Sequence, residues 1–458
     1  MANIARILAE VGETVHVIGE RWAGAPLERE ERCDGRLVIH RVGVDDEIAG
    51  TPARAGPDEL QLLGPTTFPA QRFAWRAALL AESLVRHGGI DVIEGQDWEA
   101  PLYYLLGRRA LGLGPEHGPP CVVHLHTPTE FIFRLNEWRP HRPEQLATIR
   151  MEEYCITAAD ALVCPSQYMA RQIATRYAVP LDAIAVIPYP LGDFPLVDRG
   201  DAVWRDGPFV YVGRLEPRKG LLEFVDAAVD VAKTHDQVSF DFVGDDGWYR
   251  GRQTMQQYMA GRIPRGLRER FRFHGVQPRS RLPEILGRAR AAVIPSRGEN
   301  YPNVCIEAMC SGLPVIASPT GGMVEMLDDG VTGWIASSQS AHGLAEALRR
   351  ALATPAEKFA AMGRAAAIAI RQRCRNDIIV RQQLTWRKGV VESGAARSIG
   401  MSRPGVAVPA FTPVTYAPEL SVRDILRLPM RDKASLAVRA LRHPARALAW
   451  LRSVLTPP

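Results

Sequence analysis

The chain has 458 residues, of which 46% are hydrophobic and 23% charged, so it is long enough for two or three globular domains. No segment reaches the ~18 consecutive apolar residues that a membrane-spanning helix needs. The net charge is +5, but residues 421–458 hold eight Arg or Lys against two Asp. The rest of the chain is therefore close to neutral, which argues against nucleic acid as a partner.

The first 195 residues predict one α/β domain. The chain opens with an amphipathic helical pattern instead of a signal peptide, which favours a cytoplasmic protein. Six β-branched runs follow, separated by helical patterns, as is typical of a parallel sheet covered on both faces. They lie at residues 15–19, 37–42, 91–94, 121–126, 161–164 and 184–188. A doubly wound domain normally opens with a strand, so we expect this domain to lack its first strand or the recorded start to be late.

Residues 196–390 predict a second domain of the same kind, after a proline-rich boundary. Its apolar runs lie at residues 209–213, 238–243, 271–274, 291–294, 314–317 and 334–336. The fold class expected is therefore α/β with two facing, doubly wound, Rossmann-like domains. Residues 391–458 predict a linker and a basic helical tail. Residues 421–458 could contact an anionic membrane, placing the protein at the inner membrane face, or pack against the domains.

The loop after residues 209–213 combines features of a diphosphate site. A strand ends at Gly213, and a helix is expected to begin near Gly220. Amide groups at a helix start attract anions, and Arg214 and Lys219 add two positive charges at the same place. A solvated turn with two surface cations is the alternative interpretation.

Two carboxylates accompany the next strand, loop and helix, at residues 291–317. Glu299 lies in the loop, and Glu307 lies about one turn into a helix that Asn303 is expected to cap. Both carboxylates could accept hydrogen bonds from sugar hydroxyls. A structural role at a helix N-terminus explains the pair about as well.

Taken together, these segments resemble the retaining glycosyltransferases of family 4, which have the GT-B fold. The resemblance rests on a set of motifs that covers residues 209–337 densely. They are Val212-Gly-Arg-Leu-x-x-x-Lys-Gly220, Gly275-Val276, Pro295-Ser296, Glu299-x7-Glu307, Ala308-Met-x-x-Gly312-x-Pro-Val-Ile-Ala317, Gly321-Gly322-x-x-Glu325 and Asp329-Gly-x-x-Gly333. In the first domain the match is looser, at His126-Thr-Pro and Pro165-Ser166.

The resemblance implies roles for individual residues on the donor side. Arg214 and Lys219 would hold the donor diphosphate in the loop that Gly213 opens, and Glu307 would bind the ribose hydroxyls. Glu299, with the backbone of Asn300 and Tyr301, would contact the donor sugar. Val276 would flank the base, and His126 would face the sugar across the cleft, although a core imidazole is the alternative for a lone His. Asn300-Tyr301-Pro302 replaces the usual Gly-Phe-Gly, so the donor sugar stays open.

The resemblance also implies the reaction. A hexosyl group would move from a nucleotide-diphosphate sugar to a sugar, lipid-linked or polysaccharide acceptor, with retention of configuration. No cofactor and no metal is expected, and the chain has no Asp-x-Asp motif. Asp97 and Trp98 are candidate acceptor contacts, or else a helix start with a buried aromatic ring. A non-catalytic sugar-nucleotide-binding protein and a sugar-nucleotide epimerase remain the alternatives.

Overall fold

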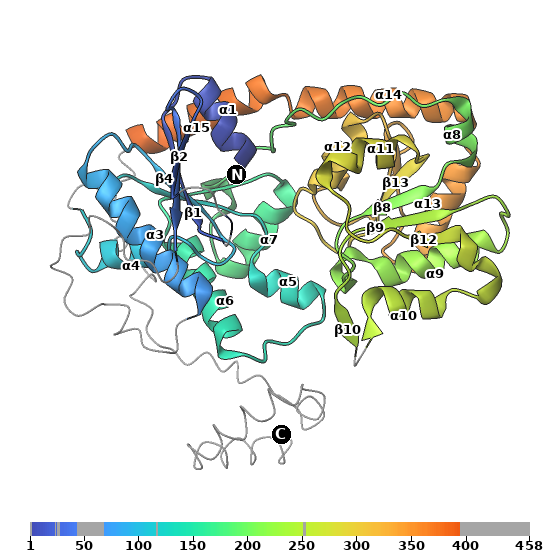
Figure 1. The fold of residues 1–458 in the computed structure, drawn as a ribbon, viewed down its shortest axis with the longest axis horizontal. Coiled ribbons are helices and arrows are strands. Elements are labelled where there is room, and N and C mark those ends of the chain that lie inside the picture. Colours follow the sequence, from blue (N-terminus) through green and yellow to red (C-terminus); the bar gives the residue numbers. More distant parts are fainter. Residues whose placement is uncertain are drawn as a thin grey trace, which may run out of the picture.

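The computed structural model describes residues 2–22, 24, 28–43, 68–115, 118–250 and 253–393, which form two α/β halves lying side by side (Figure 1). The predicted tail and its membrane contact at residues 421–458 lie outside these residues. Within the described part of the chain, no helix is both long enough and apolar enough to cross a bilayer. The fold class predicted from the sequence is confirmed.

The first half contains two sheets, with strand orders β1-β3-β2 and β4-β5-β6-β7. Its elements are α1 (Ala2–Glu10), β1 (Val15–Glu20), β2 (Arg29–Arg32), β3 (Leu37–Val42), α3 (Pro69–Arg86), β4 (Ile93–Gln96), α4 (Tyr103–Ala110), β5 (Cys121–His124), α5 (Thr129–Leu135), α6 (Pro143–Ala158), β6 (Ala161–Cys164), α7 (Gln167–Tyr177), η1 (Leu181–Ala183) and β7 (Ile184–Val186). The second sheet is parallel throughout. Among the described residues, β1 and β4 each have a strand partner on one edge only, so this half is not one continuous sheet.

The second half contains a six-stranded sheet with the order β12-β9-β8-β13-β14-β15. Its elements are α8 (Asp201–Asp206), β8 (Phe209–Val212), η2 (Pro217–Lys219), α9 (Leu221–Ala232), β9 (Phe240–Val243), β10 (Trp248–Arg250), β11 (Gln253–Thr254), α10 (Met255–Arg262), η3 (Arg265–Arg270), β12 (Phe271–Phe273), η4 (Arg279–Arg281), α11 (Leu282–Gly287), β13 (Ala291–Ile294), α12 (Asn303–Cys310), β14 (Val315–Ala317), η5 (Val324–Met326), β15 (Gly333–Ile335), α13 (Ala341–Leu352), α14 (Ala356–Arg373) and α15 (Asn376–Glu392). All strand pairs of the six-stranded sheet are parallel, whereas β10 and β11 form a separate antiparallel pair.

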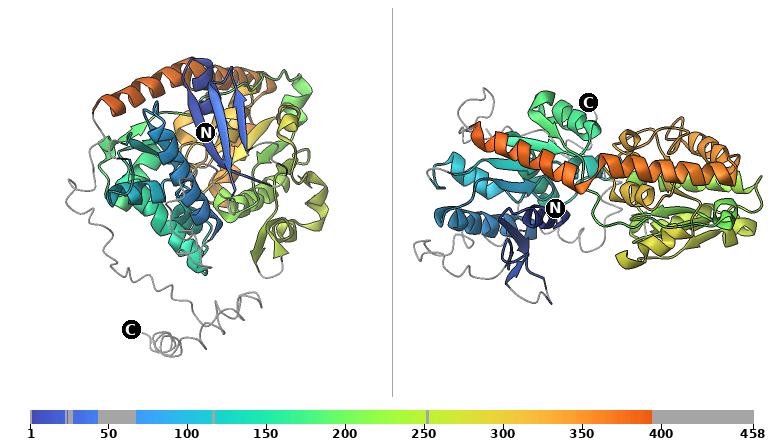
Figure 2. Two further views of the ribbon diagram at one scale, coloured as in Figure 1. Left: turned by 60° about the vertical axis from the view of Figure 1, so that its left-hand side comes forward. Right: turned by 90° about the horizontal axis from the view of Figure 1, so that it is seen from above.

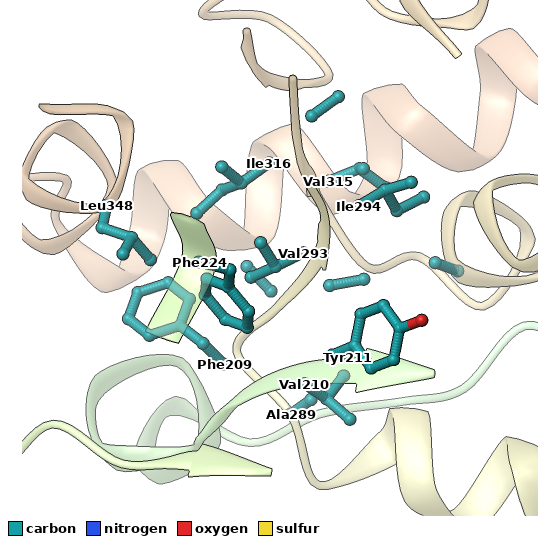
Figure 3. Packing of buried hydrophobic residues seen from close by; sticks show 14 of the residues in the cluster. Phe209, Val210, Tyr211, Phe224, Ala289, Val293, Ile294, Val315, Ile316 and Leu348 are labelled. Carbon is teal, nitrogen blue, oxygen red and sulfur yellow. The ribbon is translucent and has the colours of Figure 1, made fainter. Parts of the chain in front are cut away.

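Helices cover both faces of this sheet, which explains why its strands are continuous apolar runs. Figure 3 shows Phe209 and Phe224 packed beside Val293 and Ile316 in the core. Phe209 and Phe224 are fully buried. Burial of each such side chain stabilises the fold by ~1.5–3 kcal/mol. The core thereby fixes the strand ends from which the site loops leave.

The last two helices cross from the second half to the first, as the orange helices in the right panel of Figure 2 show. In α15, Ile379 and Val390 pack with Val122 and Val163 of β5 and β6. Arg387 of the same helix forms a two-pronged ion pair with Glu94 of β4, with an Nη2–Oε2 distance of 2.9 Å. The final helix of the described chain therefore contacts the first sheet directly. The boundary near residue 195 stays a prediction.

Candidate active site

The site lies where the loops after β5, β6 and β13 meet between the two halves. Asn300, in the loop after β13, donates through Nδ2 to the carbonyl oxygens of Leu125 (2.8 Å) and His126 (2.6 Å). Ser166 Oγ, in the loop after β6, donates to Asn300 Oδ1 at 2.7 Å. The Asn300 side chain is thus buried in contacts between the halves, a role that the sequence did not indicate.

A second contact between the halves involves the start of α7. The carboxylate of Glu325 accepts hydrogen bonds from the backbone N–H groups of Gln167 (3.0 Å) and Tyr168 (2.6 Å). A carboxylate is favourable at a helix N-terminus because the unpaired N–H groups there carry partial positive charge. Glu325 belongs to the Gly-Gly-x-x-Glu motif, so this motif helps to hold the second half against the first.

Gly220 lets the cation-bearing loop after β8 approach the loop after β13. Its φ of +67° lies in the left-handed region, and a Cβ atom there would lie 1.9 Å from the carbonyl oxygen of Pro295. Only glycine fits such a position. The short helix η2 precedes Gly220 and carries Lys219, and α9 begins immediately after it, as the sequence predicted.

Lys219 and Glu299 form a largely buried ion pair at this junction, with 17% and 11% of their side chains accessible. Lys219 Nζ contacts Glu299 Oε1, and Arg218 Nη1 lies 3.1 Å from the same oxygen. Burial raises the pKa of Glu299, but the charges of Lys219 and Arg218 outweigh it and hold the pKa below its usual value. Glu299 is therefore a carboxylate, and it is the anion that these two cations share.

Arg214 lies at the exposed side of the same cluster, with 62% of its side chain accessible. Its Nη2 is 3.4 Å from Glu216 Oε1, and Arg218 Nη2 is 2.8 Å from that oxygen. The structure thus brings Arg214, Lys219 and Glu299 into one cluster and adds Arg218 between them.

Asn136 and Arg218 are members of the cluster that sequence reasoning missed. Asn136, just after α5, accepts from the backbone N–H of Arg218 at 2.8 Å and donates to Glu216 at 3.4 Å. Arg218 stands beside Lys219 in the same motif, and this position was the available signal. Asn136 comes from the other half of the chain, and no sequence motif marked it.

Glu307 projects from α12 and pairs with Arg279, with an Nη2–Oε1 distance of 2.7 Å. Burial raises the pKa of Glu307, while Arg279 partly counteracts this effect. The prediction that Asn303 caps this helix is wrong. Pro302 is the N-cap residue, Asn303 is the first helical residue, and Cys305 N donates to the Pro302 carbonyl at 2.9 Å. Arg279 was not predicted either, because it lies in a separate short helix.

Val276 and Tyr301 occupy opposite environments. Val276 follows Gly275 and is 69% exposed, so its apolar side chain is accessible from solvent. Tyr301 is 4% exposed, and its ring meets that of Tyr189 edge-on at 6.0 Å. Its backbone, next to Asn300, lies at the junction of the halves.

His126 lies at the carboxyl end of β5, where ligands bind in parallel α/β sheets. Its backbone N–H donates to Asp97 Oδ1 at 2.9 Å. Its Nδ1 lies 2.5 Å from the hydroxyl of Tyr189, whose ring stacks on the imidazole. Burial, together with the charge of His124, lowers the pKa of His126 to about 3, so the ring is neutral.

The two predicted acceptor residues, Asp97 and Trp98, lie in different environments. Asp97 is fully buried and its Oδ1 accepts from the backbone of Trp98 and His126, whereas Trp98 is 44% exposed. Burial raises the pKa of Asp97 to about 7. The side chain therefore organises the two loops, and Trp98 is the member of the pair that offers a free aromatic face.

Comparison with known proteins agrees with this geometry. Residues 1–191 match the family described as Glycosyltransferase Family 4, and residues 205–368 match the family described as Glycosyl transferases group 1. The chain belongs to glycosyltransferase family 4. The resemblance read from the motifs is confirmed.

Several relatives of this glycosyltransferase are known. It is 28% identical to the D-inositol 3-phosphate glycosyltransferase of Acidothermus cellulolyticus over 365 residues, which cover 77% of each chain. It is 30% identical to the glycogen synthase of Mycobacterium tuberculosis over 293 residues, which cover 63% of this chain and 65% of the other. The names of these two relatives refer to different molecules, D-inositol 3-phosphate and glycogen.

Solved structures support the fold of the glycosyltransferase. Sucrose-phosphate synthase from Thermosynechococcus elongatus superposes with a TM-score of 0.60 at 19% identity, covering 85% of this chain and 92% of the other. HepE of Anabaena, in complex with UDP-glucose, gives a TM-score of 0.57 at 19% identity, covering 85% and 95%. At this identity the similarity establishes the two-domain GT-B fold alone.

Proposed function

We propose that this glycosyltransferase moves a hexosyl group, with retention of configuration and without a metal, from a nucleotide-diphosphate sugar to a sugar, lipid-linked or polysaccharide acceptor. The observation that carries the proposal is the largely buried ion pair of Lys219 and Glu299, with Arg214 and Arg218 beside it. These cations lie at the carboxyl end of β8 and face the loop after β13. In such a cluster the cations can bind an anion, and the carboxylate can accept hydrogen bonds from hydroxyl groups attached to that anion.

The chemistry follows from the charges. The bond between the anomeric carbon and the diphosphate oxygen breaks, and the acceptor oxygen bonds to the same face of that carbon. The departing diphosphate takes the proton of the acceptor hydroxyl. Lys219 and Arg214 stabilise the charge that develops on the leaving group, and one preorganised contact of this kind is typically worth ~3 kcal/mol of barrier.

The two glutamates divide the recognition of the donor. When diphosphate binds, Lys219 exchanges the carboxylate of Glu299 for phosphate oxygens, and Glu299 becomes free to accept hydrogen bonds from sugar hydroxyls. Glu307 is held by Arg279, whose side chain is 73% exposed and able to turn away. Glu307 then accepts from the ribose hydroxyls, with Val276 beside the base.

UDP-glucose is the first donor to test, because the Anabaena neighbour HepE was solved with UDP and with UDP-glucose. GDP- and ADP-sugars complete the screen. Thermal shift identifies the nucleotide that stabilises the protein, since a ligand that binds the folded state raises the melting temperature. Full activity in EDTA is expected for the metal-independent reaction.

Lys219→Ala and Arg214→Ala should each lower turnover by ~10²-fold with the donor that the screen selects. Lys233→Ala is the matched control, because Lys233 is exposed at the other end of α9. Turnover and the anomeric configuration of the product are measured by NMR. Weaker donor affinity with unchanged turnover in Lys219→Ala would contradict the role in leaving-group stabilisation. A new sugar nucleotide formed without acceptor would indicate an epimerase, and binding without any product would indicate a binding protein.

A further inference from the structure

Tyr189 lies in the segment that joins the two halves, between β7 and α8, and its ring is placed between two site residues. The Tyr189 and His126 rings stack with centroids 5.7 Å apart and an interplanar angle of 26°. On its other side, Tyr189 meets Tyr301 edge-on at 6.0 Å. Sequence reasoning assigned no role to Tyr189 itself, yet it contacts a residue from each half.

The hydrogen bond between Tyr189 and His126 determines where the imidazole proton lies. Tyr189 Oη is 2.5 Å from His126 Nδ1 and has no other hydrogen-bond partner in the described part of the chain. Burial raises the pKa of Tyr189, so the hydroxyl keeps its proton. A neutral imidazole has one N–H donor and one bare nitrogen acceptor. If Nδ1 carried the proton, the buried phenol proton would have no acceptor among these residues. The arrangement that satisfies both groups has Tyr189 donating to Nδ1, which places the ring proton on Nε2.

Hydrogen bonds on both sides of His126 hold its backbone in place. Its N–H is bound by Asp97 Oδ1 and its carbonyl accepts from Asn300 Nδ2 at 2.6 Å. His126 Nε2 is buried and has no partner within the described residues. A buried N–H group without an acceptor is unfavourable, so this atom is suited to an oxygen that a ligand supplies.

We propose that Tyr189 is a positioning residue that holds His126 in the Nε2–H tautomer and so presents a hydrogen-bond donor to the donor sugar. The identity of the ligand rests on the proposed function, but the tautomer does not. The stacked phenol ring fixes the plane of the imidazole, and the hydroxyl fixes its proton. Tyr189 would thus couple the connecting segment to recognition of the sugar.

The first test observes the tautomer itself by NMR of protein labelled with ¹⁵N-histidine. The His126 signals are assigned from their loss in His126→Gln. In the wild-type protein we expect Nε2 to be protonated and Nδ1 to be a hydrogen-bonded acceptor. Tyr189→Phe keeps the ring and removes the hydroxyl, so it should give a mixture of tautomers or the reverse one. Tyr177→Phe, which removes a buried hydroxyl without a partner elsewhere in the first half, should leave the signals unchanged.

The second test measures binding and turnover. Tyr189→Phe should lower kcat/KM for the nucleotide sugar roughly tenfold, as expected for one weakened hydrogen bond, and leave the Kd of the nucleoside diphosphate within about twofold. In a His126→Gln background the same substitution should have no further effect, because the two residues act as a unit.

The outcomes separate this inference from the proposed function. A protonated Nδ1 in the wild-type protein, or identical His126 signals in Tyr189→Phe, would overturn the role of Tyr189 whatever the enzyme transfers. An equal loss of affinity for nucleoside diphosphate and nucleotide sugar would also overturn it. The expected tautomer change in a protein that transfers no sugar would uphold the positioning role and refute the proposed function.

Discussion

At the scale of single residues, Glu299 is the centre of the charge balance in the site. Its carboxylate is largely buried, remains ionised and contacts Lys219 and Arg218. An isolated buried charge would be costly, and the two cations offset that cost. A diphosphate that binds Lys219 therefore replaces one anion with another instead of entering an unbalanced cationic pocket. Under the proposed function, this exchange would link donor binding to the freeing of a carboxylate for the sugar.

Asp97 gives a pH dependence that can be measured. Burial raises its pKa in the folded state to about 7, above its value in an unfolded chain. Between about pH 4 and pH 7 the folded state therefore holds a proton that the unfolded state has lost, so this carboxyl destabilises the fold increasingly as pH rises. Asp97→Asn keeps an oxygen for the N–H groups of Trp98 and His126 and cannot ionise.

The free energy of unfolding of Asp97→Asn minus that of the wild type should rise by up to ~4 kcal/mol as the pH is raised from 4 to 8. Urea unfolding at several pH values measures the difference. Burial raises the pKa of Glu152 to about 8 and the charge of Asp97 adds to this rise, so Asp97→Asn also eases the ionisation of Glu152 and the difference reports both carboxyls. Parallel pH profiles for the two proteins would show that Asp97 ionises normally in the folded state.

At the scale of elements, the apolar pattern of the sequence predicted the apolar strands. It missed a charged strand and the residues that meet only in the folded protein. All twelve apolar runs are strands in the structure, with ends that differ by up to about two residues. The strand β2 was missed because Arg29–Arg32 is charged throughout. Arg279 and Asn136 were missed for a different reason. Their partners Glu307 and Arg218 are distant in sequence, and only the packed fold brings them together.

The turn into α9 is the element on which the site geometry depends most. Gly220→Ala introduces a left-handed alanine and a clash with the Pro295 carbonyl, so we expect a loss of at least ~2 kcal/mol in stability. Gly389→Ala is the control, because that glycine lies inside α15 with open space around its Cβ position. There we expect a gain of ~0.5–1 kcal/mol. The midpoints of urea unfolding report both effects. An unchanged midpoint for Gly220→Ala would mean that the loops after β8 and β13 are not in close contact.

At the scale of the whole molecule, several sets of contacts among the described residues join the halves, including the one between Asn136 and Arg218. Asn300 binds the loops after β5 and β6, Glu325 binds the start of α7, and Arg387 of α15 pairs with Glu94. The motifs indicated two domains and a donor site in the second. They did not indicate these contacts, because each one pairs side chains with groups from the opposite half. The site is consequently a property of the assembled pair of domains.

The most direct test of the account compares how the protein binds a nucleoside diphosphate and the corresponding nucleoside. Calorimetric titration of wild type, Lys219→Ala and Lys233→Ala uses the nucleotide that thermal shift selects. The account predicts that wild type and Lys233→Ala prefer the diphosphate strongly, and that Lys219→Ala loses roughly tenfold or more of that preference. An undiminished preference for the diphosphate in Lys219→Ala would contradict the account.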